Sequence, residues 1–284
     1  MRVKYNFSSK FTQKQRKPSY TNQHRVPFTK MAQEVIETSD IILEILDARF
    51  IEKTRNPEIE KEVRKLGKKI IFVLNKADLV DVKELKFNYD LTQIRPYVLF
   101  STKSRIGRLR LREILSVEAS KSKFKKARVG VIGYPNTGKS SIINVLSGGR
   151  RAGVSPRAGF TKNIQNIKFR KNIIIIDTPG VITGGEENSI IPQIVKKQAE
   201  IGVKNFDKVK YPDLILNDIM KENPGIFDEH YEVDSGNDIE NLLDILGRKW
   251  DFLKKRGVID QDRTARKILK EWQDGKIRKK ILAA

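Results

Sequence analysis

The chain has 284 residues but no cysteine, and its two histidines, His24 and His230, lie far apart in the sequence. The absence of cysteine excludes a disulfide framework and a cysteine-based zinc site. Two isolated histidines cannot hold a metal ion by themselves. Long apolar runs are also missing. Runs such as Ile41–Leu46 and Ile173–Ile176 have the length of a strand, far short of the ~20 residues that a membrane helix needs, so we expect no membrane partner.

Acidic residues are absent from the first 33 positions, which contain eight Lys and Arg. This basic arm, residues 1–30, has no hydrophobic centre, so it is not a secretory signal. An acid-free start is also typical of an organellar transit peptide, but here Gln, Asn and Lys outnumber Arg and Ser, and no amphipathic repeat is present. We expect a cytoplasmic protein whose arm is either a solvated tail or a segment that becomes ordered on RNA.

Positive charge dominates the whole chain, with a formal net charge of +22 and an isoelectric point near 10. An excess of this size indicates a polyanionic partner, nucleic acid before membrane. The hydrophobic fraction of 38% is enough for a packed core, and the length allows one sizeable domain and a smaller one.

Apolar stretches of strand length alternate with helical patterns up to about residue 187. This alternation predicts an α/β fold, a doubly wound and mostly parallel sheet with helices on both faces. A basic connector, residues 121–128, joins the two halves of this region. The predicted strands are residues 41–46, 70–74, 97–100, 129–132, 164–169 and 173–176, and the predicted helices are 57–66, 82–93, 107–119 and one from 139.

From about residue 188 only helical patterns remain, which predicts a small all-helical C-terminal domain over residues 188–284. One helical face is apolar from Ile239 to Leu253, and Gly257 ends that helix. We expect both tryptophans, Trp250 and Trp272, to pack in the core. The following helix should present basic residues that contact RNA: Arg263, Arg266, Lys267 and Lys270.

Residues Gly133 to Ser140 spell G-Y-P-N-T-G-K-S, which fits the pattern G-x-x-x-x-G-K-S between a predicted strand and a predicted helix. Glycines let backbone N–H groups face phosphates, and the helix N-terminus adds positive potential. Lys139 should contact the β- and γ-phosphates, and Ser140 should ligate Mg²⁺. A simple Gly-rich turn would also match the pattern, but the apolar strand before it argues against that alternative.

A second string, Asp177-Thr178-Pro179-Gly180, follows a strand of four isoleucines. Asp177 should hold Mg²⁺ through water, and the N–H of Gly180 should meet the γ-phosphate. Thr161 precedes this string and is predicted to supply a hydroxyl that closes on Mg²⁺, although it could be an ordinary loop threonine. The predicted metal site is therefore Ser140, Thr161 and Asp177.

The string Asn75-Lys76-Ala77-Asp78 predicts a preference for guanine. The carboxylate of Asp78 can accept hydrogen bonds from guanine N1–H and N2–H₂, and adenine offers no such pair. Lys76 can lie along the base plane, and Asn75 can tie this loop to the phosphate loop. Ser101-Thr102-Lys103 is predicted to place a backbone N–H at guanine O6.

Polar residues follow five predicted strands directly, at Asp47, Asn75, Ser101, Gly133 and Asp177. The carboxyl ends of parallel strands meet at one edge, where such sheets bind ligands. The predicted catalytic groups are Thr161, Gly180 and Asn136. The predicted nucleotide-binding residues are Asn75, Lys76, Asp78, Ser101, Thr102, Lys103, Asn136, Thr137, Gly138, Lys139, Ser140, Ser141, Thr161, Asp177 and Gly180.

The guanine-selective string precedes the phosphate loop, which reverses the order of ordinary GTPases and predicts a circularly permuted domain. With Asp47-Ala48-Arg49 before N-K-x-D and Gly159-Phe160-Thr161 after the phosphate loop, the chain resembles the circularly permuted YlqF/YawG-type GTPases that assist ribosome assembly. The resemblance covers nearly the whole chain, including the helical tail. It implies a P-loop GTPase domain over residues 31–187.

Val181 stands where many GTPases have the glutamine that orients the attacking water, so the resemblance implies slow intrinsic hydrolysis with help from elsewhere. Asn136 matches the phosphate-loop asparagine of potassium-stimulated relatives, but it could equally cap a turn. Some relatives have a histidine before Met-Ala near the start of the chain. Lys30 precedes Met31 here, and no catalytic histidine is assigned.

The expected function is a Mg²⁺-dependent GTPase switch, with K⁺ as an optional second cation. Its expected partners are GTP and GDP, rRNA and a ribosomal subunit precursor, with no DNA or membrane. The arm, the connector, the C-terminal helices and Arg150, Arg151 and Arg157 are expected RNA contacts, although each charge alone could simply be solvated. The alternative is a GTP-binding RNA scaffold with negligible hydrolysis. A signalling GTPase is disfavoured by the basic excess and the lack of lipidation signals.

Overall fold

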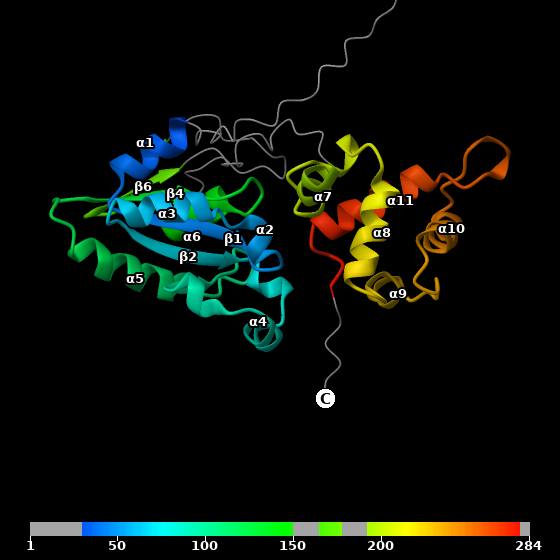
Figure 1. Cartoon of the computed structure of the whole chain (residues 1–284), viewed down its shortest axis with the longest axis horizontal. Coiled ribbons are helices and arrows are strands. Elements are labelled where there is room, and N and C mark those ends of the chain that lie inside the picture. The colour runs from blue at the N-terminus through cyan, green and yellow to red at the C-terminus, as the bar shows by residue number, and fades with distance from the viewer. Residues whose placement is uncertain (1–29, 150–164, 178–191, 279–284) are drawn as a thin grey trace, which may run out of the picture.

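The computed structural model describes residues 30–149, 165–177 and 192–278. Figure 1 shows a sheet with helices on both of its faces, and a separate cluster of helices formed by the C-terminal part of the chain. The N-terminal arm up to residue 29, with His24, and the basic residues Arg150, Arg151 and Arg157 lie outside the described residues.

Six strands form one sheet in the order β3-β2-β1-β4-β6-β5. All neighbours pair in parallel except β5, which is antiparallel to β6 and forms one edge. The predicted α/β class with a mostly parallel sheet is confirmed. The strands are β1 (Ile41–Asp47), β2 (Lys69–Asn75), β3 (Tyr97–Leu99), β4 (Ala127–Ile132), β5 (Gln165–Arg170) and β6 (Ile173–Asp177).

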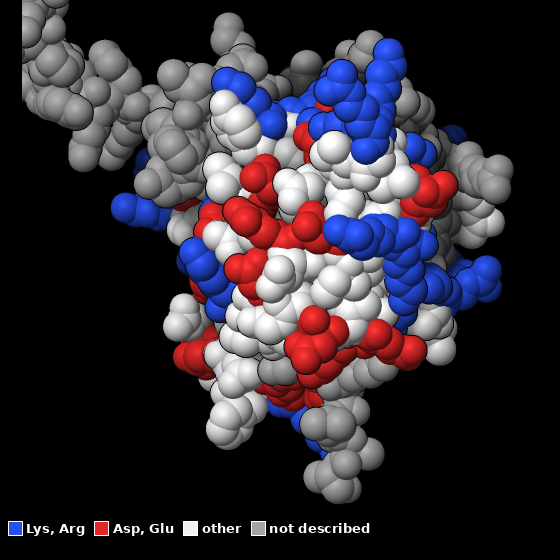
Figure 2. All heavy atoms as spheres, turned by 90° about the vertical axis from the view of Figure 1, so that its right-hand side faces the viewer, with Lys and Arg blue, Asp and Glu red and all other residues white. Residues whose placement is uncertain are grey.

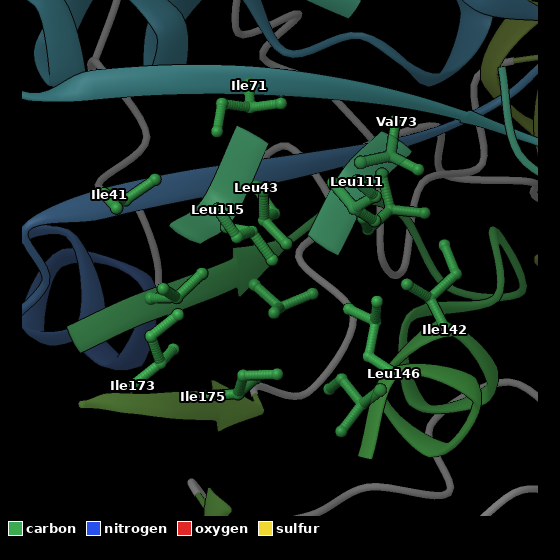
Figure 3. Packing of buried hydrophobic residues seen from close by; sticks show 14 of the residues in the cluster. Ile41, Leu43, Ile71, Val73, Leu111, Leu115, Ile142, Leu146, Ile173 and Ile175 are labelled. Atoms are coloured by element: carbon green, nitrogen blue, oxygen red, sulfur yellow. The ribbon is translucent and has the colours of Figure 1, made fainter. Parts of the chain in front are cut away.

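Helices cover both faces of the sheet because successive strand residues point to opposite sides. Along β1, Ile41, Leu43 and Ile45 pack with helices α5 (Arg108–Ser120) and α6 (Lys139–Ser147), as the close view in Figure 3 shows for Ile41 and Leu43. On the other face, Ile42 and Leu46 pack with helices α1 (Lys30–Thr38), α2 (Ile51–Thr54) and α3 (Pro57–Lys65).

Capping residues set several helix boundaries. Helix α3 begins at Pro57, and the side chain of Asn56 accepts a hydrogen bond from the N–H of Ile59, as is typical of a helix start. The predicted helix over 82–93 is wrong in length, because α4 ends at Asn88. The side chain of Asp90 then accepts from the N–H of Thr92 and starts a 3₁₀-helix. The 3₁₀-helices are η1 (Ala77–Leu79), η2 (Leu91–Ile94), η3 (Phe206–Lys208) and η4 (Lys255–Gly257), and α4 spans Val82–Asn88.

The C-terminal part has a core of its own, to which Trp272 contributes with 6% exposure and against which Trp250 packs. The expected all-helical character is confirmed, apart from a single bridge between Leu253 and Ile259. The prediction that Leu253 lies on the buried helical face is wrong. Helix α10 ends at Lys249, before the left-handed backbone of Asp251, which leaves Leu253 45% exposed. The helices are α7 (Pro192–Glu200), α8 (Pro212–Glu222), α9 (Ile226–Tyr231), α10 (Ile239–Lys249) and α11 (Gln261–Gln273).

Candidate nucleotide-binding site

The predicted polar residues gather at the carboxyl edge of the sheet. Asp47 and Asn75 are the last residues of β1 and β2 and face each other in the strand register. Asp177, the last residue of β6, is paired with β4, which runs directly into Gly133. Ser101 comes two residues after β3. The edge therefore brings Asn75, Gly133 and Asp177 together, one residue from each of the three strings that the sequence separates.

The phosphate loop, residues 133–140, requires glycine at two places. The backbone of Gly133 has φ 146°, and an added Cβ would stand 2.4 Å from the carbonyl oxygen of Ile45. The backbone of Gly138 has φ 97°, and a Cβ there would stand 2.2 Å from the side-chain nitrogen of Asn75. Both positions are left-handed, and both are crowded by a neighbouring strand end. A side chain at Gly133 would push the loop away from β1, and one at Gly138 would push it away from Asn75.

Lys139 is buried at the start of α6, inside the curve of the phosphate loop. Its ammonium donates to the carbonyl oxygens of Gly133 at 3.0 Å and Tyr134 at 2.8 Å. Burial lowers the pKa of Lys139 to about 8, and the carboxylate of Asp177 opposes that shift only in part. Lys139 forms no ion pair with any described residue, and a buried cation of this kind gains more from an arriving phosphate than a solvated lysine would.

The predicted magnesium ligands on the described residues lie next to each other. The hydroxyl of Ser140 donates to Oδ2 of Asp177 at 3.1 Å. A hydroxyl and a carboxylate are hard oxygen donors of the kind that Mg²⁺ prefers, and the ion usually completes its shell with water and substrate phosphates. Within residues 30–149, 165–177 and 192–278, no cluster of three or more His, Cys, Asp or Glu could form an all-protein metal cage. The donor set therefore fits a magnesium ion that arrives with a nucleotide.

Asn75 joins the base-recognition string to the phosphate loop. Its Nδ2 donates to the carbonyl oxygen of Thr137 at 2.7 Å, and both residues are 1% exposed. A net contribution of about 1 kcal/mol is typical of such a buried bond, and the cost of leaving its partners unsatisfied is larger. The tie expected of Asn75 is present in the structure.

The carboxylate of Asp78 is oriented by the loop that follows β3, residues 101–104. The hydroxyl of Ser101 donates to Oδ1 of Asp78 at 2.6 Å, and the N–H of Ser104 donates to that hydroxyl at 3.0 Å. Of the neighbouring predicted residues, Thr102 lines the adjoining cavity and Lys103 is exposed. Asp78 and Ser101 thus form one unit, as the prediction of a shared base-binding role requires.

The carboxylate of Asp47 binds two cationic side chains, a role that the sequence did not predict. Its Oδ2 accepts from Lys76 at 2.7 Å and from Arg49 at 2.8 Å, and Arg49 also donates to the carbonyl oxygen of Trp272 at 3.1 Å. Burial alone would raise the pKa of Asp47, but the two cations outweigh burial and hold the pKa well below its usual range. The string Asp47-Ala48-Arg49 is the sequence feature that belongs to this network. Asp47 holds the ammonium of Lys76, and Arg49 contacts the helical part.

A cavity of about 560 Å³ lies between the sheet edge and the helical part. Its sheet-side wall consists of Asn75, Lys76, Thr102, Asn136, Gly138 and Ser141. Its opposite wall comes from the segment after α7 and from α11, and includes Phe206, Asp207 and Lys270. No sequence pattern predicts this second wall, because the strings that recognise nucleotides end before residue 188.

The helical part also touches the phosphate loop directly. The Nζ of Lys197 on α7 donates to the hydroxyl of Tyr134 at 2.9 Å, and Nδ2 of Asn136 donates to the carbonyl oxygen of Gly202. Asn136, which has a left-handed backbone with φ 62°, thus contacts the helical part. Its amide oxygen is the atom that could ligate a K⁺ ion.

Some predicted residues lie outside the described residues, namely Thr161, Gly180 and Val181. Their predicted roles in metal binding and hydrolysis stay predictions. Within the described residues, no helix has both the length and the apolarity that a membrane crossing requires.

Comparison with known proteins places residues 128–274 within the family model of the 50S ribosome-binding GTPase. The chain is 39% identical over 257 residues to an uncharacterised GTP-binding protein of Methanocaldococcus jannaschii, covering 89% of this chain and 66% of that protein. It is 34% identical over 255 residues to nucleolar GTP-binding protein 2 of Neurospora crassa, covering 86% of this chain and 40% of that protein. The chain thus spans less than two thirds of either relative.

Among solved structures, GNP-bound YlqF from T. maritima superposes with a TM-score of 0.62 at 24% identity, covering 87% of this chain and 93% of that one. This likeness concerns the fold and confirms the predicted P-loop GTPase sheet with its helical C-terminal region. Because the base-recognition string on β2 precedes the phosphate loop after β4, the domain is circularly permuted.

Proposed function

The chain belongs to the family of 50S ribosome-binding GTPases, and we propose that it is a Mg²⁺-dependent GTP switch that binds rRNA in a precursor of the large ribosomal subunit. The observation that carries the proposal is the hydrogen bond from Asn75 to Thr137, which joins the guanine-selective and phosphate-binding strings across 62 positions of sequence. The two strings therefore form one site, with a cavity of about 560 Å³ beside it. The names of the two relatives support GTP binding.

Within this site, Asp78 and Ser101 recognise the guanine edge, and Lys139 with the backbone of the phosphate loop holds the phosphates. Ser140 and Asp177 hold Mg²⁺, which neutralises charge on the β- and γ-phosphates. Thr161 and Gly180 close on the γ-phosphate, and Asn136 holds a K⁺ ion that supports hydrolysis. The hydroxyl of Ser140 lies 3.1 Å from the carboxylate of Asp177, and this closeness of two oxygen donors supports the magnesium assignment.

We divide the chain into a basic arm (1–30), a GTPase domain (31–187) and a helical domain (188–284). The helical domain responds to the nucleotide, since it supplies one wall of the cavity and contacts the phosphate loop through Lys197 and Gly202. The GTP form presents basic surfaces to rRNA, and hydrolysis releases them. The net charge of +22 supports an RNA partner in the cytoplasm.

Sedimentation with purified large-subunit precursors tests this proposal. The full chain should migrate with the precursor in the presence of Mg²⁺ and a non-hydrolysable GTP analogue, and should stay in the upper fractions with GDP. A fluorescent nucleotide assay on the same sample should show guanine nucleotides bound at least 100-fold more tightly than adenine nucleotides. Migration that does not depend on the nucleotide would remove the switch, and equal affinity for ATP and GTP would remove the base assignment.

A GTP-binding RNA scaffold with negligible hydrolysis is the second candidate, because Val181 replaces the glutamine that orients water in many GTPases. Multiple-turnover phosphate release in the presence of subunit precursors separates the two. The switch requires a release rate that rises on addition of precursor, and the K⁺ assignment requires a faster rate in K⁺ than in Na⁺. Absence of turnover under both conditions would favour the scaffold.

A further inference from the structure

Positive charge is distributed unevenly along the chain. Residues 91–176 contain 19 Lys and Arg but only two acidic residues, Glu113 and Glu118. The helical region, residues 188–284, contains 19 Lys and Arg against 17 Asp and Glu. Figure 2 shows carboxylates spread across the middle of the outward face of that region. Apart from the N-terminal arm, the basic excess therefore comes from the segment 91–176.

Helix α5 and strand β5, which both belong to that segment, form one continuous surface. The Nη1 of Arg170 on β5 donates to the hydroxyl of Ser116 on α5 at 2.8 Å. The guanidinium groups of Arg112 and Arg170 lie 5.6 and 5.7 Å from the ring centre of Phe169. We call this the α5–β5 surface and define it by Arg105, Arg108, Arg112, Arg170 and Lys171.

The carboxylates of the segment do not neutralise this surface. Glu113 pairs with Arg110 at 3.7 Å and Glu118 pairs with Lys121 at 2.8 Å, while Arg108, Arg112 and Arg170 form no ion pair with any described residue. The Nε atoms of Arg108 and Arg112 are buried without a hydrogen-bond partner among the described residues.

Burial, and then the charges of Arg108 and Arg170, lower the pKa of Arg112. Like charges held this close destabilise the folded chain. Arg112 also donates to the carbonyl oxygen of Leu146, and Arg112 and Arg170 lie over Phe169, so part of each side chain serves packing. No carboxylate of the described residues pairs with these charges, so the cluster calls for an anion that lies outside the chain.

A cavity of about 360 Å³ adjoins the surface where α6 ends. It is lined by Arg105 and Arg108 and by Asn144, Val145, Gly148 and Gly149. Arg105 and Arg108 belong to its lining. A guanidinium group is planar and can donate two parallel hydrogen bonds to the oxygens of one phosphate. The cavity lies beside the loop of Ser101, so an anion bound here would be close to the guanine-recognition loop.

We propose that the α5–β5 surface is the binding site for the phosphodiester backbone of double-stranded RNA. The proposal rests on the proposed function and names the surface through which the GTPase domain itself contacts rRNA. The partner is RNA, because the net charge of +22 indicates a polyanion and the cations extend from α5 to β5, as contacts along a phosphate backbone require. Helix α5 and the turn before it also expose Ile106, Leu109 and Val117, so the test includes a membrane and an acidic peptide as competing partners. Sequence-independent duplex binding depends on such phosphate contacts.

The test is the salt dependence of binding to a 20-base-pair RNA duplex, measured by fluorescence anisotropy on the full chain between 50 and 200 mM KCl. The test variant is Arg108→Gln with Arg170→Gln. The matched control is Lys61→Gln with Lys65→Gln, which removes the same charge from exposed positions on α3, on the opposite face of the sheet. GDP affinity and thermal unfolding of each variant report whether the fold and the nucleotide site are intact.

The test variant should bind the duplex at least 10-fold more weakly at 100 mM KCl, and its plot of log K against log salt should be shallower by about 2. The control should stay within twofold of the parent chain. Equal weakening by both variants, or binding to phosphatidylserine vesicles or a poly-glutamate peptide in preference to RNA, would overturn the proposal. If the parent chain binds no RNA at all, the proposed function fails. If it binds RNA and the test variant binds equally well, only the α5–β5 assignment fails.

Discussion

The ammonium of Lys197 on α7 donates to the hydroxyl of Tyr134 at 2.9 Å and stands 4.7 Å from the centre of that ring. Tyr134 is the second residue of the phosphate loop and is 1% exposed. Its carbonyl oxygen accepts from Lys139 at 2.8 Å and from the hydroxyl of Thr137 at 2.8 Å. Helix α7 therefore contacts Tyr134, whose carbonyl oxygen holds two side chains of the phosphate loop. We expect the loop and α7 to respond to nucleotide together.

Replacing Lys197 with Met keeps the length of the side chain and removes the hydrogen bond and the cation over the ring. These contacts are worth about 1–2 kcal/mol together. We expect GDP affinity to fall by about 5-fold, and GDP should protect the amides of residues 196–202 from hydrogen exchange less than in the parent chain. Calorimetry and exchange measured by mass spectrometry provide the two readouts.

Lys210→Met is the matched control, because Lys210 stands 5.1 Å from the ring of Tyr211, which is 54% exposed and outside the nucleotide cavity. It removes the same chemical group from the same kind of contact. If Lys197→Met and Lys210→Met bind GDP equally well, the contact between Lys197 and Tyr134 contributes to packing and not to nucleotide binding.

Asp78→Asn tests base recognition. The carboxamide keeps the size of the side chain but presents a donor where guanine also has one, so GTP affinity should fall by at least 100-fold. Xanthosine triphosphate carries a carbonyl at position 2 and should bind this variant more tightly than GTP. Competition against a fluorescent nucleotide measures both.

Ser101→Ala provides the graded comparison, since the hydroxyl donates to Asp78 at 2.6 Å. Loss of one such bond to a carboxylate costs about 1.5–3 kcal/mol at most, so GTP affinity should fall less than in Asp78→Asn, and no preference for xanthine should appear. An Asp78→Asn variant that still prefers GTP would place the guanine edge elsewhere in the cavity.

Asp47→Asn should cost about 3 kcal/mol of folding free energy, because it leaves the half-buried Arg49 and Lys76 without the buried carboxylate that they share. The pKa of Asp47 lies below its usual range in the folded chain, so the unfolded chain takes up a proton first as the pH falls. The stabilisation is therefore present above about pH 4 and is lost as the pH falls further.

Urea unfolding between pH 3 and pH 7 measures this effect. The parent chain should lose stability toward pH 3 more steeply than Asp47→Asn. Asp238→Asn is the control, because Asp238 caps helix α10 on the surface and an asparagine can replace it there. Identical pH profiles of the parent chain and Asp47→Asn would mean that the two cations do not depend on this carboxylate.

The sequence predicted the sheet well because most strands are rich in apolar residues and end at a polar residue or glycine. Strand β1 is interrupted by Glu44 alone, and β5 alternates apolar with polar residues, as an edge strand does. It also predicted that Asn75 ties its loop to the phosphate loop, because both strings follow strand ends at one edge of the sheet. The hydrogen bond from Asn75 to the carbonyl oxygen of Thr137 is that tie, while the nucleotide-binding roles of these residues stay predictions.

The contacts between the sheet and the helical part could not be inferred in the same way. Arg49 reaches the backbone of Trp272 across 223 positions, and Asn136 reaches the backbone of Gly202. A backbone carbonyl has no residue-specific signature, so no pattern in the sequence identifies it as an acceptor. The prediction for Leu253 was wrong for a related reason. The helical spacing of apolar residues continues in the sequence beyond Asp251, whose left-handed backbone lies just after the end of the helix.

Lys139 makes nucleotide binding depend on pH in a direction opposite to stability. Burial lowers its pKa to about 8 in the free protein, against about 10.4 for an ordinary lysine. Between these values the unfolded chain binds a proton that the folded chain does not, so the free energy of unfolding should rise with pH.

Bound phosphates favour the ammonium form of Lys139, so binding takes up a proton above pH 8 and GDP affinity should fall by up to 10-fold per pH unit. GMP is the control ligand, because it lacks the β-phosphate that Lys139 contacts while its base titrates as that of GDP does. GDP affinity should therefore fall more steeply than GMP affinity between pH 7 and pH 9, and parallel curves for the two would show that the ammonium of Lys139 does not meet the β-phosphate.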